Sequence, residues 1–135
     1  DKPRLLDLFC GAGGAAVGYH RAGFNVVGVD NRPQPNYPFE FFEDDALDYL
    51  RDFYYERTFP PFDAIHASPP CQAYTQLGKG EHPRLVEPVR ELLRETGLPY
   101  VIENVVGAPL ESPAMLCGSM FGLRVRRGFR NFSGR

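Results

Sequence analysis

The distribution of apolar positions over the first thirty residues predicts a strand, a helix and a second strand. Residues 4–9 form a short apolar run of strand length, which leads into a segment containing Gly11, Gly13 and Gly14. Residues 15–22 can form a helix, and a second apolar run covers residues 24–29. A glycine loop between a strand and a helix lets backbone N–H groups approach a nucleotide-like ligand.

The alternation of strand-like and helix-like segments continues along the chain. The further elements that the pattern predicts are a proline-rich loop at 31–38, a strand from Phe41 or Phe42, a helix at 46–55, a strand at 62–67, a helix at 85–96 ended by Gly97, a strand at 98–102, one or two helical turns at 114–120 and a strand at 121–126. This order predicts an α/β fold with a doubly wound, mostly parallel sheet, in a single domain over residues 1–135.

Composition is typical of a globular protein. The 135 residues are 43% hydrophobic and 24% charged, which is enough to bury a core, and no apolar run has the length of a membrane span. Three cysteines without paired spacing indicate a reducing, intracellular setting, so a cytoplasmic protein is expected. They also argue against a disulfide framework or a zinc site, and no metal is expected.

Charge is distributed unevenly, although the net charge of −2 does not itself indicate nucleic-acid binding. Acidic residues concentrate in residues 40–56, whereas arginines gather near the C-terminal end with no acid among them: Arg124, Arg126, Arg127, Arg130 and Arg135. A solvated terminus and a phosphate-facing strip both explain this pattern.

The segment Ser68-Pro69-Pro70-Cys71-Gln72 is the main candidate for chemistry. Its two prolines end the preceding strand and fix an extended turn, so the cysteine is presented at the mouth of a strand. A lone cysteine is often a buried small side chain, but a core position does not need a stiff turn beside a polar amide. Cys71 is therefore a candidate nucleophile.

Three acidic residues follow or end predicted strands. Asp30 lies beyond the glycine loop, where a carboxylate can accept hydrogen bonds from ribose hydroxyls. Asp45 lies at the next strand-to-helix corner, where it can cap the helix or bind the amine of an adenine. Glu103 directly follows the strand at 98–102. Catalysis is favoured there over a carboxylate satisfied by backbone donors, because parallel strands end at one crevice.

These residues together resemble the DNA (cytosine-5) methyltransferases. Residues 7–14, Asp30, Asp45, Pro70-Cys71-Gln72 and Glu103-Asn104-Val105 occur in that family's order and with plausible spacing. The resemblance extends from Leu5 to about Arg127, and the last two blocks are its specific part, since many folds share glycine loops. It implies a Rossmann-like methyltransferase that uses S-adenosylmethionine, with double-stranded DNA as its partner.

The resemblance also implies roles for individual residues. Phe9 would lie near the adenine of the cofactor, Asp30 would hold the ribose hydroxyls and Asp45 the adenine amine. The full set that would bind S-adenosylmethionine is Phe9, Gly11, Gly13, Gly14, Asp30, Asn31, Asp45 and Pro70. The substrate would be contacted by Gln72, Asn104 and Arg130.

For catalysis, the resemblance implies that Cys71 attacks C6 of cytosine and that Glu103 binds the N3 and amino edge, with Arg127 as a third catalytic residue. A thiolate added at C6 turns the ring into an enamine that can take a methyl group at C5. An acid that donates a hydrogen bond at N3 stabilises the charge that this addition creates. A cytosine in a duplex would have to rotate out of its stack to reach Cys71.

The sequence departs from the family pattern in two places. The family's basic block usually reads Arg-x-Arg before an aromatic residue. Here Arg127 fits the first arginine, but Gly128-Phe129 separate it from Arg130. The sequence also stops where family members continue with a target-recognition domain. The resemblance therefore implies a truncated catalytic domain, which either acts with a second polypeptide that supplies target recognition or is an inactive fragment.

Three other functions fit parts of the pattern. They are cytosine-C5 methylation of RNA such as tRNA, a non-catalytic cofactor-binding module, and a nicotinamide-dependent Rossmann enzyme; the last gives Cys71 and Glu103 no role. Three histidines have no visible partner in the sequence and are assigned no role: His20, His66 and His82. Cys10 and Cys117 are expected to be packed thiols.

Overall fold

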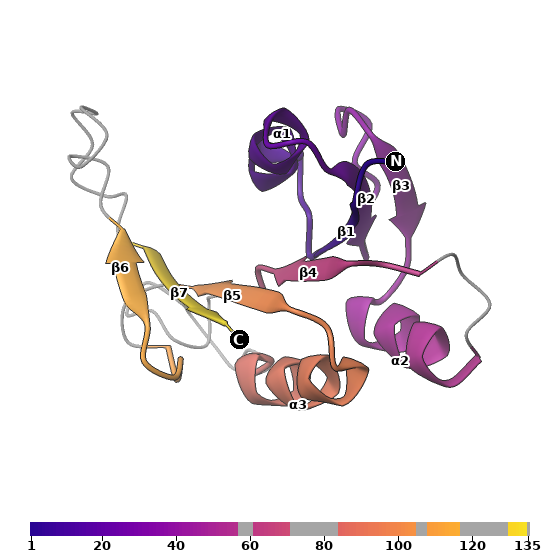
Figure 1. Cartoon of the computed structure of the whole chain (residues 1–135). Helices are drawn as coiled ribbons and strands as arrows, with labels where there is room; N and C mark the ends of the chain where they lie inside the picture. Colours follow the sequence, from indigo (N-terminus) through magenta and orange to yellow (C-terminus); the bar gives the residue numbers. More distant parts are fainter. Residues whose placement is uncertain (57–60, 71–83, 105–107, 117–129, 135) are drawn as a thin grey trace.

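A computed structural model describes residues 1–56, 61–70, 84–104, 108–116 and 130–134. Over these ranges the chain forms a seven-stranded sheet with the strand order β3-β2-β1-β4-β5-β7-β6 and with helices on both faces (Figure 1). Five neighbouring strands are parallel: β1 (Arg4–Leu8), β2 (Asn25–Asp30), β3 (Glu40–Glu43), β4 (Ala64–Ala67) and β5 (Tyr100–Asn104). The predicted doubly wound, mostly parallel α/β fold is confirmed.

The order of strands reverses at β1. From β1 the chain builds β2 and β3 on one side and then returns to place β4 and β5 on the other. In the register of this centre, Asp7 lies opposite Gly28 of β2 and His66 of β4. The loops after β1 and β4 therefore leave the sheet in opposite directions, which is where open α/β sheets form a ligand crevice.

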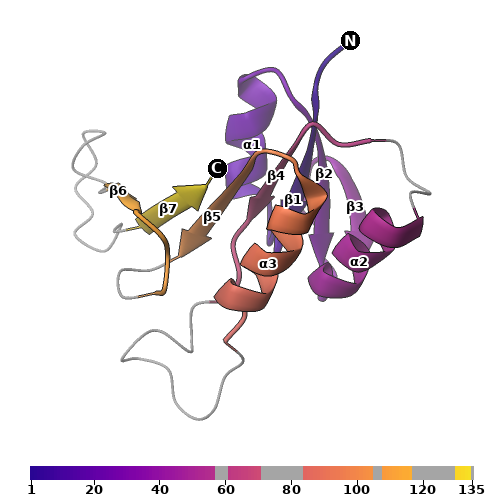
Figure 2. The same ribbon diagram turned by 60° about the horizontal axis from the view of Figure 1, so that its bottom comes forward.

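Each face of the sheet has its own core. Helix α1 (Gly14–Arg21) covers one face, and α2 (Ala46–Glu56) and α3 (Val86–Thr96) cover the other (Figure 2). Strand residues alternate between the faces. The core on the α1 side contains Leu5, Ala16, Val26 and Tyr37, and the larger core opposite is built around Leu6, Leu8, Val29, Leu50, Ile65, Val89, Leu93 and Ile102.

The helices lie close to where the sequence predicts them. Helix α3 places Val86, Val89 and Leu93 in the larger core and ends at Gly97, whose φ of 69° is readily adopted by glycine. None of the described helices is long and apolar enough to cross a membrane.

The prediction of helical turns at 114–120 is wrong for residues 114–116, because Ala114–Leu116 is a strand, β6; residues 117–120 lie outside the described residues. This strand pairs antiparallel with β7 (Arg130–Gly134), and that pairing holds it extended. Strand β7 has no apolar periodicity and is held by pairing on both sides, with β5 and β6. The predicted strand at 121–126 lies outside the described residues.

Candidate functional site

The loops that follow the central parallel strands are joined at one edge of the sheet by backbone hydrogen bonds. The three bonds run from the Cys10 N–H to the Val29 carbonyl (3.1 Å), from the Asp44 N–H to the Asp30 carbonyl (3.0 Å) and from the Ser68 N–H to the Leu8 carbonyl (3.2 Å). The ends of β1, β2, β3 and β4 therefore form one continuous rim, and most of the predicted site residues that the structure describes lie along it.

The glycine loop has the backbone conformation that its sequence predicts. Gly11 and Gly13 have φ values of 56° and 102°, in the region that glycine adopts without steric cost. A Cβ atom placed at Gly11 or Gly14 would meet no heavy atom within 4 Å, so the space beside this loop is open. Gly13 is the N-cap of α1 and has no side chain to cap it. The first N–H groups of the helix therefore receive no hydrogen bond from a capping side chain.

Asp30 joins the end of β2 to the glycine loop. Its Oδ2 accepts a hydrogen bond from the Gly11 N–H (2.9 Å), and its Oδ1 accepts one from the Arg32 N–H (3.1 Å). Each carboxylate oxygen has a second acceptor site, so the side chain can bind hydroxyl groups while it holds the loop. The structure brings the acid and the loop together, and the contact with ribose stays a prediction.

Replacing Asp30 with alanine is expected to weaken the binding of S-adenosylmethionine by about 10- to 100-fold, because the change removes a charged acceptor and the partner of the Gly11 N–H. Isothermal titration calorimetry measures this directly, with Asp52→Ala, an exposed acid of α2, as the matched control. Equal dissociation constants for Asp30→Ala and the unaltered chain would show that Asp30 does not belong to the cofactor site.

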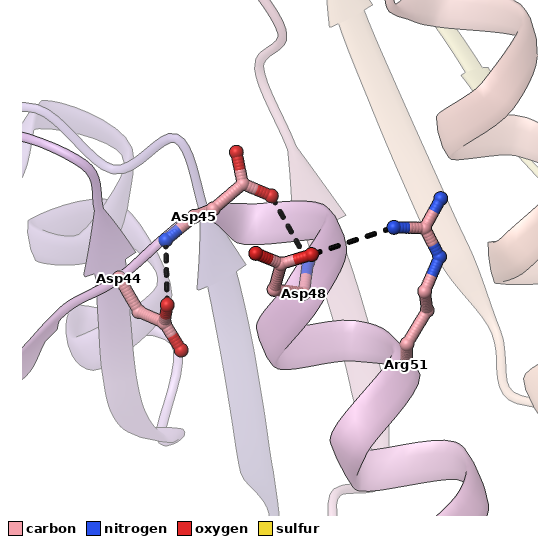
Figure 3. A network of polar contacts seen from close by, with 4 residues as sticks. All are labelled: Asp44, Asp45, Asp48 and Arg51. Atoms are coloured by element: carbon pink, nitrogen blue, oxygen red, sulfur yellow. Dashed lines mark hydrogen bonds and ion pairs between the residues drawn. The ribbon is translucent and has the colours of Figure 1, made fainter.

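Asp45 caps helix α2, which is one of its two predicted roles. Its Oδ1 accepts a hydrogen bond from the Asp48 N–H (3.0 Å), while Asp44 accepts one from the Asp45 N–H (2.8 Å). Figure 3 shows the other oxygen of Asp45 pointing away from Asp48, which itself pairs with Arg51. Asp45 is exposed at the rim, and its contact with an adenine amine stays a prediction.

Tyr37 supports the glycine loop from the α1 face, and the sequence did not indicate this role. The ring is buried, and its hydroxyl donates a hydrogen bond to Oδ2 of Asp7 (3.4 Å). A Cβ atom on Gly13 would lie 2.9 Å from Pro38 and 3.1 Å from the Tyr37 ring. The proline-rich loop at 31–38 thus packs against the glycine loop through the buried side chain of Tyr37.

Asp7 and His66 are buried polar residues on adjacent strands, with 1% and 3% of their surface exposed. Burial raises the pKa of Asp7 to about 7; the hydrogen bond from Tyr37 opposes this shift, and the charge of Asp30 adds to it. Burial also lowers the pKa of His66 to about 4. At pH values well inside the interval between these two pKa values, both side chains are therefore largely uncharged in the folded chain.

These two shifts give opposite contributions to the pH dependence of stability. As the pH rises from 4 to 7, the folded chain keeps a proton on Asp7 that the unfolded chain has lost, so Asp7 lowers the free energy of unfolding across this window. His66 raises the free energy of unfolding as the pH rises from 4 to 6.5, because in this range the unfolded chain carries a proton on His66 that the folded chain lacks.

Asp7→Asn is therefore expected to make the free energy of unfolding rise more steeply with pH than in the unaltered chain. The difference in slope between pH 4.5 and 6.5 should approach about 1.4 kcal/mol per pH unit, which corresponds to one proton. Urea unfolding at several pH values measures it, with Asp52→Asn as the matched control. Parallel stability curves for Asp7→Asn and the unaltered chain would contradict the assignment.

The turn after β4 is held by β5. The side-chain amide of Asn104 donates a hydrogen bond from Nδ2 to the carbonyl oxygen of Pro69 (3.0 Å), and Asn104 is 1% exposed. Glu103 and Asn104 lie inside β5, not beyond it, because pairing with β7 extends the strand through both residues. Since strand residues alternate, Glu103 faces the α1 side of the sheet. The predicted contacts of both residues with substrate stay predictions.

Three predicted site residues lie outside the described residues: Cys71, Gln72 and Arg127. Cys71 follows directly on Pro70, the last described residue of the turn, and Arg130 begins β7. Cys10 is a half-buried thiol that packs against the α1-side core, as expected. Burial and the charges of Asp7 and Asp30 raise its pKa to about 12, so this thiol stays protonated. Among the described residues no three potential ligands group as a metal site.

Comparison with known protein families places residues 3–106 in the family of C-5 cytosine-specific DNA methylases. Among curated proteins, the type II methyltransferase M.HgiGI of Herpetosiphon aurantiacus is 35% identical over 83 residues, which cover 56% of this chain and 65% of that protein. The type II methyltransferase M.FnuDI of Fusobacterium nucleatum is 29% identical over 82 residues. These cover 56% of this chain but only 22% of that protein.

Solved structures show the same fold. The S. pombe Dnmt2 methyltransferase superposes with a TM-score of 0.69 at 18% identity, over 99% of this chain and 49% of that one. A SAM-dependent methyltransferase from Agrobacterium tumefaciens superposes with a TM-score of 0.55 at 21% identity, over 78% of this chain and 39% of that one. The expected Rossmann-like methyltransferase fold is thereby confirmed.

Proposed function

Because the chain belongs to the family of C-5 cytosine-specific DNA methylases, we propose that it transfers a methyl group from S-adenosylmethionine to C5 of cytosine in DNA. The observation that carries this proposal is the rim at the β1/β4 junction. There the glycine loop follows β1 and is hydrogen-bonded to Asp30. The Pro69-Pro70 turn follows the adjacent strand β4, is hydrogen-bonded to Asn104 and leads into Cys71.

The residues on the rim fit S-adenosylmethionine. The open space beside Gly11 and Gly14 can take a ligand close to the backbone, and the Asp30 carboxylate beside it suits a ribose diol. When bound, the cofactor supplies a methyl group on a positively charged sulfur. Of the predicted set, Phe9 has a φ of 56° and packs against the larger core, while Asn31 and Pro70 lie next to the loops that the rim joins.

The proposed reaction begins at Cys71. Its thiolate forms a bond to C6 of the cytosine, which makes C5 nucleophilic enough to take the methyl group. The C5 proton then leaves to a base or to water, and the electron pair it leaves behind expels the cysteine sulfur from C6. Methylated cytosine and free Cys71 result. A target in a duplex must first be rotated out of the stack.

Glu103 is proposed to bind the N3 and amino edge of the cytosine. It is the penultimate residue of β5, the strand next to β4, and it faces the α1 side of the sheet near the turn that leads to Cys71. A protonated carboxyl that donates at N3 stabilises the negative charge that thiolate addition places on the ring. Gln72 and Asn104, and the arginines Arg127 and Arg130, are proposed to assist by contacting the substrate.

Double-stranded DNA is the proposed partner. The arginines between residues 124 and 135 supply charge for its phosphates. Because the chain matches only part of the length of its relatives, we also propose that target recognition comes from a further segment or a second polypeptide.

The product of the reaction tests this proposal. The protein is incubated with S-adenosylmethionine and either unmethylated duplex DNA of mixed sequence or an unmodified tRNA transcript, and the nucleosides are then separated by mass. The proposal expects 5-methyl-deoxycytidine from DNA. Methylation of the tRNA alone would assign the activity to RNA, and methylation at the amino nitrogen of cytosine would exclude the Cys71 mechanism.

A further inference from the structure

His66 occupies an unusual position for a polar residue. It lies within β4, where Ile65 and Ala67 face the larger core and His66 faces α1 with 3% of its surface exposed. A buried histidine needs partners for both ring nitrogens. One of these partners could not be found from the local sequence, because it lies 47 residues away in helix α1.

Both ring nitrogens of His66 have a partner. Nδ1 lies 2.7 Å from the hydroxyl oxygen of Tyr19 on α1, and Nε2 lies 2.8 Å from Oγ of Ser68. The Tyr19 ring also packs edge-on against the imidazole, with centroids 5.2 Å apart, and against Phe24 at 5.8 Å. These contacts fix the position of each member of the chain Tyr19–His66–Ser68.

The hydrogen-bonded series Tyr19–His66–Ser68 ends at Ser68, where the turn begins. Ser68 is followed by Pro69 and Pro70, which have no N–H and cannot anchor the turn with backbone donors. The turn therefore depends on the residues at its base. On one sheet face the Ser68 hydroxyl contacts His66, and on the other the Pro69 carbonyl accepts the hydrogen bond from Asn104.

A neutral imidazole has one donor and one acceptor nitrogen, which suits two hydroxyl partners that can each donate or accept. An imidazolium has two donor nitrogens, so after protonation the hydroxyl oxygens of Tyr19 and Ser68 would both have to accept hydrogen bonds from the ring. The lowered pKa of about 4 keeps His66 neutral near pH 7.

We propose that the Tyr19–His66–Ser68 chain is a positioning device, which holds the Ser68-Pro69-Pro70 turn at the orientation needed to present Cys71 to its substrate. The inference rests on the function proposed above for Cys71, and it assigns a role in that reaction to a histidine and a tyrosine that contact neither substrate nor cofactor. Its physical basis is that the turn has two side-chain anchors, one on each face of the sheet.

The test compares His66→Leu, which removes both contacts, with His66→Gln, whose amide reaches about as far as Nε2 and can bond Ser68. Tyr19→Phe deletes a single oxygen and keeps the ring, so it remains informative even if His66→Leu is too unstable to study. Amide hydrogen exchange is measured in the free protein for Ser68, whose N–H is bonded to the Leu8 carbonyl, and, as reference, for β1 and the first residues of β4.

We expect exchange at Ser68 to be about tenfold faster in His66→Leu, and several-fold faster in Tyr19→Phe, with the reference strands within about twofold, because one buried hydrogen bond is worth roughly that factor. His66→Gln should restore most of the protection. Unchanged exchange at the turn, or an equal rise over the whole sheet, would overturn the proposal, since the latter is what a purely structural role produces.

A second measurement separates this proposal from the proposed function. The rate at which the protein forms an adduct with duplex DNA containing 5-fluorocytosine is expected to fall about tenfold in Tyr19→Phe, while the dissociation constant for S-adenosylmethionine stays within about twofold. If the unaltered protein binds the cofactor and the DNA but forms no adduct, the proposed function fails, and the exchange data still decide whether Tyr19, His66 and Ser68 hold the turn. An unchanged adduct rate beside faster exchange would refute the catalytic role of the positioning.

Discussion

Replacing Cys71 with alanine is expected to abolish methyl transfer, by at least about a thousandfold, and to leave the binding of S-adenosylmethionine intact. Without the thiolate, C5 of cytosine does not become nucleophilic, so no step after binding proceeds. Apart from Pro70, the residues proposed to bind the cofactor belong to other loops, so the affinity for S-adenosylmethionine should not change. Transfer of a radioactive methyl group to DNA measures the first effect, and calorimetry measures the second.

The matched control for this prediction is Cys117→Ala, because Cys117 is a second cysteine to which no role is assigned. Cys117→Ala should retain its activity. Turnover in Cys71→Ala above one hundredth of the normal rate would contradict the covalent mechanism. Loss of cofactor binding in the same variant would instead indicate a misfolded protein and make the activity measurement irrelevant.

Replacing Gly28 with alanine is expected to lower the free energy of unfolding by about 3 kcal/mol, at the upper end of what overpacking in a core costs. Gly28 lies in the middle of β2, and a Cβ atom there would overlap the ring of Tyr37. Either the strand or the ring must move. Movement of the ring removes the hydrogen bond to Asp7 and the support of Gly13, so weaker cofactor binding should accompany the loss of stability.

Two controls isolate this cause. Gly18→Ala introduces the same methyl group in α1, where a Cβ atom meets nothing within 4 Å, and should be neutral or stabilising because alanine favours a helix. In a Tyr37→Ala background, Gly28→Ala should cost far less than in the unaltered chain. Additive effects of the two changes, determined by urea unfolding, would show that the ring of Tyr37 is not what excludes a side chain at position 28.

Local rules were sufficient to predict the glycine loop, Asp30 and the end of α3. A glycine loop between strand and helix, an acid after the next strand and a glycine after an apolar helical face each depend on neighbours in sequence. The structure bears out the geometry in each case, with Asp30 bonded to the Gly11 N–H and Gly97 in the left-handed region. The fold class followed for the same reason, because it depends on the order of such segments.

Contacts between distant segments were not predictable in this way. Tyr37 and Asp7 are 30 residues apart, and Tyr19 and His66 are 47 apart. Nothing in their immediate surroundings identifies the partner. His66 was assigned no role for this reason, although a histidine within an apolar strand is a signal that a buried partner exists. Strand β6 was missed because its conformation is set by pairing with β7 and not by its own periodicity.

The central claim is that this chain forms a covalent bond between Cys71 and cytosine. The most direct measurement is a denaturing gel of the protein after incubation with S-adenosylmethionine and duplex DNA that contains 5-fluorocytosine, in which the C5 fluorine prevents release of the enzyme. The account predicts a protein–DNA band of lower mobility that requires the cofactor and disappears in Cys71→Ala. A band that persists in Cys71→Ala, or no band from a protein that binds the cofactor and the DNA, would contradict it.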